Sequence, residues 1–95
     1  MSMKNPAHPG ALVKGNIEEL GLTTATAAKA LGITRQQLHN VITARSAVSP
    51  EMAVRFEKGF GGSADMWLKM QANYDLAAVR ARDSEINVTR LVAAE

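Results

Sequence analysis

The chain has 95 residues, of which 46% are hydrophobic and 21% charged, and it contains no cysteine. This composition indicates one folded domain with a modest core, and it excludes a disordered chain, a disulfide scaffold and a metal site built from thiolates. The formal net charge is only +2, but residues 1–48 carry five basic and two acidic side chains (+3), whereas residues 49–95 carry six basic and seven acidic ones (−1).

The first predicted helix begins at Pro9, a residue that suits the first helical position, and ends at Gly21. Its apolar stripe is expected to consist of Leu12, Val13, Ile17 and Leu20. We expect His8 to be a capping or surface residue, because no second ligand or carboxylate lies near it in the sequence. Gly10 and Gly15 lower the helix propensity, so tertiary packing has to hold this helix in place.

Residues 24–43, TATAAKALGITRQQLHNVIT, predict two short helices joined by a tight turn. Gly32 suits the left-handed conformation at the end of the first helix, and Thr34 can cap the start of the second. Ile33 can fill the wedge between the helices. The buried faces are expected to be formed by small or apolar side chains: Ala27, Ala28, Leu31, Leu38 and Val41. This combination predicts a helix-turn-helix that binds DNA.

The polar side chains of the second helix then face outward. Arginine suits the acceptors of guanine, glutamine and asparagine suit adenine, and threonine can touch a thymine methyl group. The candidate base-reading residues are Arg35, Gln36, Gln37, His39, Asn40 and Thr43. The candidate phosphate contacts are Thr24, Lys29, Thr34, Arg45 and Ser46. The segment from Gly21 to Pro50 holds no acidic residue, as expected of a DNA-facing surface. The alternative is an ordinary helical hairpin with a solvated polar face.

Two further helices follow. Ser49, Pro50 and Glu51 form a helix start, and the buried stripe of that helix is expected to comprise Met52, Ala53, Phe56 and Phe60 before a glycine-rich end. Ser63 caps a longer helix over residues 64–85. The aromatic side chains of this last helix recur at helical spacing, which favours an internal core or a protein interface over a base-stacking platform.

Residues 86–95 change character, because they are rich in strand formers although no other segment predicts a strand. We therefore divide the chain into a helix-turn-helix domain (1–85) and an extended or strand-like interaction tail (86–95). Three outcomes stay open for the tail: pairing with a second protomer, docking onto another protein, or disorder when free. The candidate dimer contacts are Trp67, Met70, Tyr74, Ile86, Val88 and Leu91.

The chain resembles the HigA-type antitoxins, a branch of the Xre/Cro-repressor helix-turn-helix family, over roughly residues 8–76. The resemblance is carried by His8-Pro9-Gly10, Gly21-Leu22-Thr23, the block from Ala28 to Arg35 with Leu38, Ser49 to Ala53, Phe60-Gly61, Trp67-Leu68, Gln71 and Tyr74-Asp75-Leu76. It implies an all-α, five-helix fold of the lambda-repressor type with an extended or short-strand C-terminal tail. One departure is Ala27-Ala28, where many relatives have a leucine before the alanine.

The resemblance also implies a function. Such a protein neutralises a RelE-like mRNA endonuclease of the HigB type by binding it, and represses its own operon as a homodimer on double-stranded operator DNA. The family's reading-helix positions fall on Arg35, Gln36, Gln37, His39 and Asn40. A stand-alone Xre-family repressor without a toxin is the alternative.

We do not expect an enzyme, because the two histidines lie far apart and the chain lacks cysteine and a glycine-rich phosphate loop. No metal, cofactor, small-molecule substrate or membrane is expected. The absence of a long apolar run or a signal-peptide core favours a cytoplasmic, nucleoid-associated protein.

Overall fold

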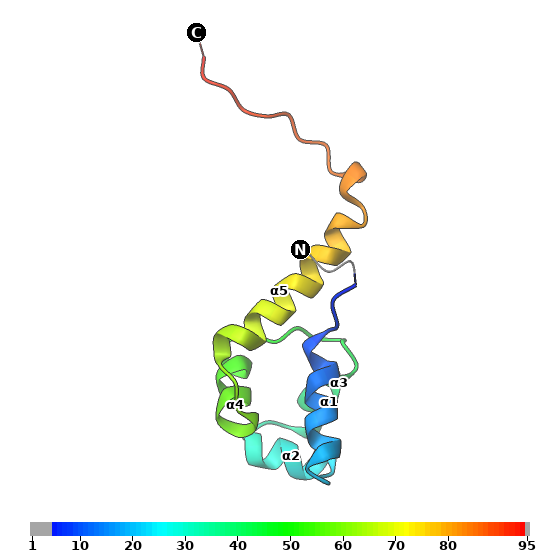
Figure 1. Cartoon of the computed structure of the whole chain (residues 1–95), viewed down its shortest axis with the longest axis vertical. Helices are drawn as coiled ribbons and strands as arrows, with labels where there is room; N and C mark the ends of the chain where they lie inside the picture. The colour runs from blue at the N-terminus through cyan, green and yellow to red at the C-terminus, as the bar shows by residue number, and fades with distance from the viewer. Residues whose placement is uncertain (1–4, 95) are drawn as a thin grey trace.

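The computed structural model describes residues 5–94, and within them the fold is all-α. Five helices follow one another: α1 (Pro9–Glu19), α2 (Thr24–Leu31), α3 (Arg35–Ile42), α4 (Pro50–Phe60) and α5 (Ala64–Arg80), with a short 3-10 turn at Asp83–Glu85. The end of α5 and residues 86–94 project from the packed helices, so the molecule measures 62 × 26 × 23 Å (Figure 1). The expected five-helix fold is thereby confirmed.

Each of the five α-helices begins at a side chain that accepts a hydrogen bond from a backbone amide of its first turn. The caps are His8, Thr23, Thr34, Ser49 and Ser63. Such a cap satisfies one of the amide groups that have no partner at a helix start. The helix starts expected at Pro9, Thr34, Ser49 and Ser63 are confirmed.

The first three helices also end in the same way. Gly21, Gly32 and Ala44 have φ angles of 70°, 73° and 61°, which place each of them in the left-handed region. In all three, the next residue donates to a carbonyl five positions back, as in Arg45 N to Asn40 O at 2.8 Å. This is the Schellman arrangement. At the third position the chain uses alanine, for which the left-handed conformation is costly.

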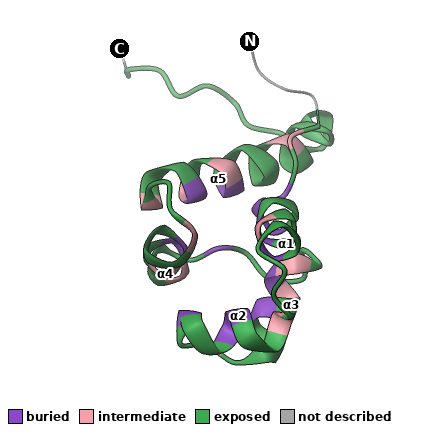
Figure 2. Ribbon diagram, turned by 60° about the horizontal axis from the view of Figure 1, so that its bottom comes forward, coloured by how far each residue is buried: buried purple, intermediate pink, exposed green. Residues whose placement is uncertain are grey.

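The core lies between the five helices, whose buried faces turn toward a common centre (Figure 2). Trp67 of α5 packs on Phe56 and Phe60 of α4, with ring centroids 5.0 and 6.2 Å apart. The Trp67 indole nitrogen also donates to the Gly61 carbonyl at 3.2 Å. These contacts bury the largest side chains and fix α5 across the end of α4.

Two expectations need correction. The buried stripe of α1 is narrower than predicted, because Leu12 and Leu20 are 37% and 60% exposed and only Val13 and Ile17 of the four residues are buried. The last helix ends at Arg80 instead of residue 85. Residues 81–85 are all exposed, so no core contact favours continuing the helix there.

Residues 86–94 are extended and form no strand. Of the helices in residues 5–94, none combines the length and the apolar character needed to cross a bilayer.

Candidate nucleic-acid interface

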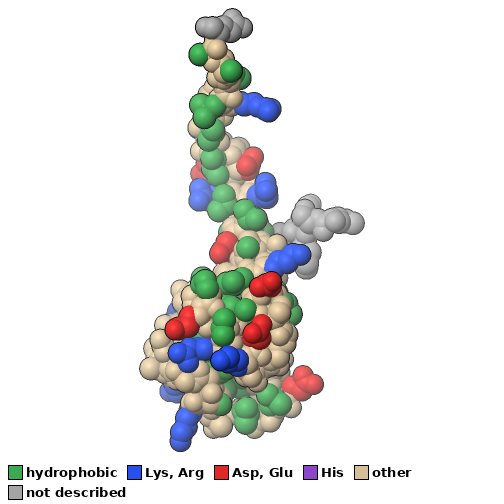
Figure 3. Space-filling model, turned by 90° about the vertical axis from the view of Figure 1, so that its left-hand side faces the viewer, with side chains coloured by type: hydrophobic (Ala, Val, Ile, Leu, Met, Phe, Trp, Pro, Cys, Tyr) green, Lys and Arg blue, Asp and Glu red, His purple; other side chains and the backbone are tan. Residues whose placement is uncertain are grey.

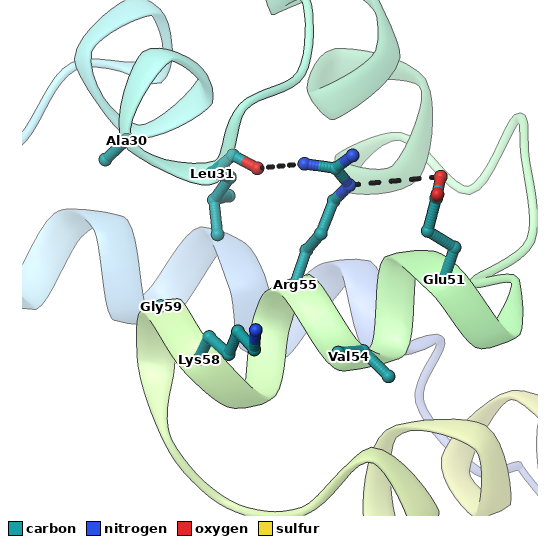
Figure 4. Close-up of a pocket in the computed structure, with 7 residues that line it drawn as sticks. All are labelled: Ala30, Leu31, Glu51, Val54, Arg55, Lys58 and Gly59. Carbon is teal, nitrogen blue, oxygen red and sulfur yellow. Dashed lines mark hydrogen bonds and ion pairs between the residues drawn. The ribbon is translucent and has the colours of Figure 1, made fainter.

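The turn between α2 and α3 is stabilised by a hydrogen bond within it and by an arginine of α4. Within it, Ile33 N donates to Ala28 O at 3.0 Å, and the Ile33 side chain packs half-buried against the core. From α4, the Arg55 guanidinium donates to the carbonyl of Leu31 at 2.9 Å (Figure 4) and also to that of Gly32 at 3.3 Å. A cation is favourable at the C-terminal end of a helix, where the last carbonyls lack helical partners. Arg55 therefore stabilises the turn that orients α3.

Backbone contact with α1 also positions α3. A Cβ atom at Gly10 would overlap the carbonyl oxygen of Val41 and would lie 2.9 Å from the Val41 carbonyl carbon and 3.0 Å from the Ile42 Cα. Only glycine allows so close an approach. Leu38 and Val41 are 0% and 1% exposed, which confirms that this face of α3 points inward.

The opposite face of α3 is polar and open. At 3.6 residues per turn, Gln36, Asn40 and Thr43 lie opposite the buried residues, Arg35 and His39 lie to one side, and Gln37 lies to the other. Gln36 Nε2 donates to Asn40 Oδ1 at 2.9 Å, so the two amides are already oriented relative to each other. They leave an amide donor and an acceptor on one surface, the pattern that suits an adenine edge.

Two of the candidate base-reading side chains also form hydrogen bonds with the backbone of the protein. The Gln37 side chain accepts from Thr34 N at 2.8 Å, and the Thr34 hydroxyl accepts from Gln37 N at 3.0 Å, which completes a capping box. The Thr43 hydroxyl donates to the His39 carbonyl at 2.9 Å. These bonds give Gln37 and Thr43 a local structural role in addition to the expected one.

A shallow groove of about 430 Å³ brings three of the candidate residues together. Its lining joins the end of α1, the start of α2 and one side of α3: Lys14, Ile17, Glu18, Leu22, Thr23, Thr24, His39, Ile42 and Thr43. Thr24, a candidate phosphate contact, thus lies across the groove from His39 and Thr43. The other phosphate candidates line no part of this groove: Lys29 is exposed on α2, Thr34 at the start of α3, and Arg45 and Ser46 in the loop after α3.

The residues expected to form a dimer contact divide into two groups. Trp67 is 1% exposed and belongs to the core of its own protomer, so its assignment to a subunit contact is wrong. Met70 is half-buried and Tyr74 is 36% exposed. Ile86, Val88 and Leu91 are 44%, 83% and 95% exposed, and they stay candidates.

His8 connects the start of α1 to α5. Its Nδ1 accepts from Gly10 N at 2.9 Å, and its ring meets that of Tyr74 edge-on at 4.9 Å. Burial lowers the pKa of His8 below 6.5, and the negative charge of Asp75 opposes this shift. The neutral ring that the cap requires is therefore favoured, and the expected capping role is confirmed.

Sequence reasoning assigned no positioning role to three residues that position the interface: Gly10, Arg55 and Gln71. Gln71 is 6% exposed, and its side chain bonds to Val48 N in the loop after α3. The available signal for this residue was its spacing, because Gln71 follows Trp67 by four positions and therefore lies on the same face of α5. For Arg55, the sequence indicates only a surface pair with Glu51, which is present at 3.9 Å.

Comparison with known proteins identifies the family. The helix-turn-helix family model matches residues 16–67, just over half of the chain. The chain belongs to the Xre-type helix-turn-helix family. Members of this helix-turn-helix family are DNA-binding antitoxins and transcription regulators, not enzymes.

Two relatives are similar to this chain over most of their own length. Virulence-associated protein A′ of Dichelobacter nodosus is 44% identical over 78 residues, which cover 81% of this chain and 68% of that protein. An uncharacterized HTH-type transcriptional regulator, YddM of Escherichia coli (strain K12), is 30% identical over 91 residues, which cover 96% of this chain and 94% of that protein.

Solved structures of antitoxins share the fold. Antitoxin GraA in complex with its operator has a TM-score of 0.82 at 32% identity, covering 98% of this chain and 97% of GraA. Pseudomonas aeruginosa antitoxin HigA with the higBA promoter has a TM-score of 0.79 at 27% identity, covering 85% of this chain and 89% of that chain. These matches confirm the resemblance to HigA-type antitoxins.

Proposed function

We propose that this helix-turn-helix protein is the antitoxin of a type II toxin–antitoxin pair. It neutralises a RelE-like mRNA endonuclease of the HigB type by direct binding. As a homodimer on double-stranded operator DNA in the bacterial cytoplasm, it represses its own operon.

The observation that carries the DNA-binding part is the open polar face of α3. Its centre holds the Gln36–Asn40 amide pair, and Arg35 and His39 extend it to one side. GraA, whose fold matches almost the whole chain, was solved in complex with its operator. In our proposal, α3 reads base edges through Arg35, Gln36, Gln37, His39, Asn40 and Thr43. Phosphates are bound by Thr24, Lys29, Thr34, Arg45 and Ser46.

A homodimer is supported by charge and by exposed apolar surface. Residues 1–48 carry a net charge of only +3, so a second copy doubles the attraction to phosphates. Hydrophobic side chains continue along the projecting segment, with basic and acidic ones beside them (Figure 3). In the proposed dimer, Met70, Tyr74 and the interaction tail (residues 86–95) form the contact, with Ile86, Val88 and Leu91 as its apolar residues. Two-fold symmetry then presents the two α3 helices to successive major grooves, about 34 Å apart.

Operator binding is tested by titrating the promoter DNA of the protein's own operon with the purified chain. We expect saturable binding to an inverted repeat and a steep loss of affinity as salt rises. Asn40→Ala should relax the preference at one base pair of each half-site and cost about 1–3 kcal/mol there. Lys58→Ala, on the outer side of α4, is the matched control and should leave base preference unchanged. Equal affinity for every sequence would refute the reading-helix assignment.

The toxin half of the proposal rests on the similarity to proteins named as antitoxins. Co-expression with the product of the neighbouring reading frame tests it. We expect rescue of growth and co-purification of a complex.

A stand-alone transcription regulator is the second candidate. It is favoured by the 30% identity to YddM, a relative named as an HTH-type transcriptional regulator, over nearly the full length of both chains. Operator binding without growth rescue or co-purification would favour this candidate.

A further inference from the structure

Gln71 is a buried polar side chain of α5 that faces the loop between α3 and α4, where this loop passes beneath α5 (Figure 1). Both ends of its amide have a partner. Oε1 accepts from Val48 N at 2.9 Å, and Nε2 donates to Asp75 Oδ1 at 3.0 Å. Asp75 thereby orients the amide so that its oxygen points at the loop.

The loop is attached at both of its ends. At its start, the backbone amides of Arg45 and Ser46 donate to Asn40 O at 2.8 and 3.1 Å. At its end, Val48 is 3% exposed and bonds to Gln71. Only Ala47 separates the two attachments, and the side chain of the candidate phosphate contact Arg45 is exposed at the first of them.

We propose that Gln71 is a positioning residue for DNA binding, whose amide fixes the loop so that Arg45 meets a backbone phosphate beside α3. The proposal rests on the operator binding proposed above. The Val48 amide lies at a buried position, so water is a poor substitute for the Gln71 oxygen. Without this bond the loop is held only by the two backbone bonds to Asn40 O, so the second constraint on the position of Arg45 is lost and has to be restored on each binding event.

The test is a double-mutant cycle read through the salt dependence of operator binding. Gln71→Met keeps the length and helix propensity of the side chain but removes the hydrogen bond to Val48. In the wild-type chain, Arg45→Ala should reduce the slope of log K against log salt by about 0.9 per protomer. In the Gln71→Met chain, that slope should already be reduced, and adding Arg45→Ala should change it little. Lys29→Ala, on α2 outside the loop, should act equally in both backgrounds.

If Gln71 only stabilises the fold, Gln71→Met lowers stability, but its effect on the salt slope adds to that of Arg45→Ala and to that of Lys29→Ala. An additive cycle in the folded variants would therefore overturn the proposal. Absence of operator binding by the wild-type chain would instead overturn the proposed function.

If Gln71→Met fails to fold, Asp75→Ala replaces it, because this change leaves the Gln71 oxygen available to Val48 and removes the group that orients the amide. We then expect a smaller reduction of the slope with the same coupling to Arg45. An additive result for this pair would again overturn the proposal.

Discussion

The substitution Gly10→Ala, which adds one methyl group, tests how closely α1 packs against α3. In Gly10→Ala, the new Cβ overlaps the Val41 carbonyl oxygen and crowds the backbone on to Ile42. Backbone atoms cannot rotate away as a side chain can, so α1 and α3 have to separate. Gly15→Ala is the matched control, because a Cβ there meets nothing within 4 Å.

The two substitutions are expected to change the free energy of unfolding in opposite directions. Alanine in place of glycine inside a helix gains about 0.5–1 kcal/mol from propensity, and this is the full effect expected at Gly15. At Gly10, overpacking costs about 1–3 kcal/mol and more where backbone is displaced, so we expect a net loss of roughly 2 kcal/mol. For a domain of this size, that loss lowers Tm by about 8–16 °C.

Thermal and urea unfolding, followed by circular dichroism, measure both effects. Operator affinity, measured well below Tm, should fall for Gly10→Ala because Val41 and Ile42 belong to the reading helix, and it should not change for Gly15→Ala. A Gly10→Ala chain as stable as Gly15→Ala would refute the close approach of α1 to α3.

Three further predictions concern helix ends. Arg55→Met should cost about 1–2 kcal/mol of unfolding free energy in urea titrations, because it removes charge-assisted bonds to two carbonyls. Glu51→Gln removes the exposed 3.9 Å pair and the acidic charge in the first turn of α4, and it should cost less, about 0.3–1 kcal/mol. Ala44→Gly should raise stability by about 0.5–1 kcal/mol, since glycine adopts a φ of 61° without strain, and a lower Tm would contradict this. Folding lowers the pKa of His8 below 6.5, so the unfolded chain binds this proton before the folded chain does as the pH falls. The free energy of unfolding is therefore highest above pH 6.5 and decreases until the pH reaches the lowered pKa. The difference in unfolding free energy between pH 7.5 and pH 5 should shrink in His8→Asn, which keeps a cap without titrating there; an unchanged difference would rule out His8 as the cause.

The sequence predicts the local features of this fold well. The left-handed turn at Gly32 and the caps at Thr34 and Ser49 depend on residues within four positions of each other, so they can be read from the chain. Helical periodicity likewise identifies the buried face of α3 through Leu38 and Val41.

The missed features depend on contacts between distant residues. Arg55 bonds to Leu31, 24 positions away, and Gln71 bonds to Val48, 23 positions away. The sequence does not show why position 10 has to be glycine, because the helix that approaches Gly10 lies some 30 residues further along the chain. Periodicity also places Trp67 on an apolar face without deciding between its own core and a partner's surface.

The boundary between the packed helices and the projecting segment predicts where a protease can cleave the folded protein. Every buried side chain described here precedes residue 72, whereas Arg80, Arg82 and Arg90 are exposed at or beyond the end of α5. A protease that cleaves after these arginines can remove the segment without breaking a core contact. We therefore expect limited proteolysis to shorten this protein without unfolding its packed helices.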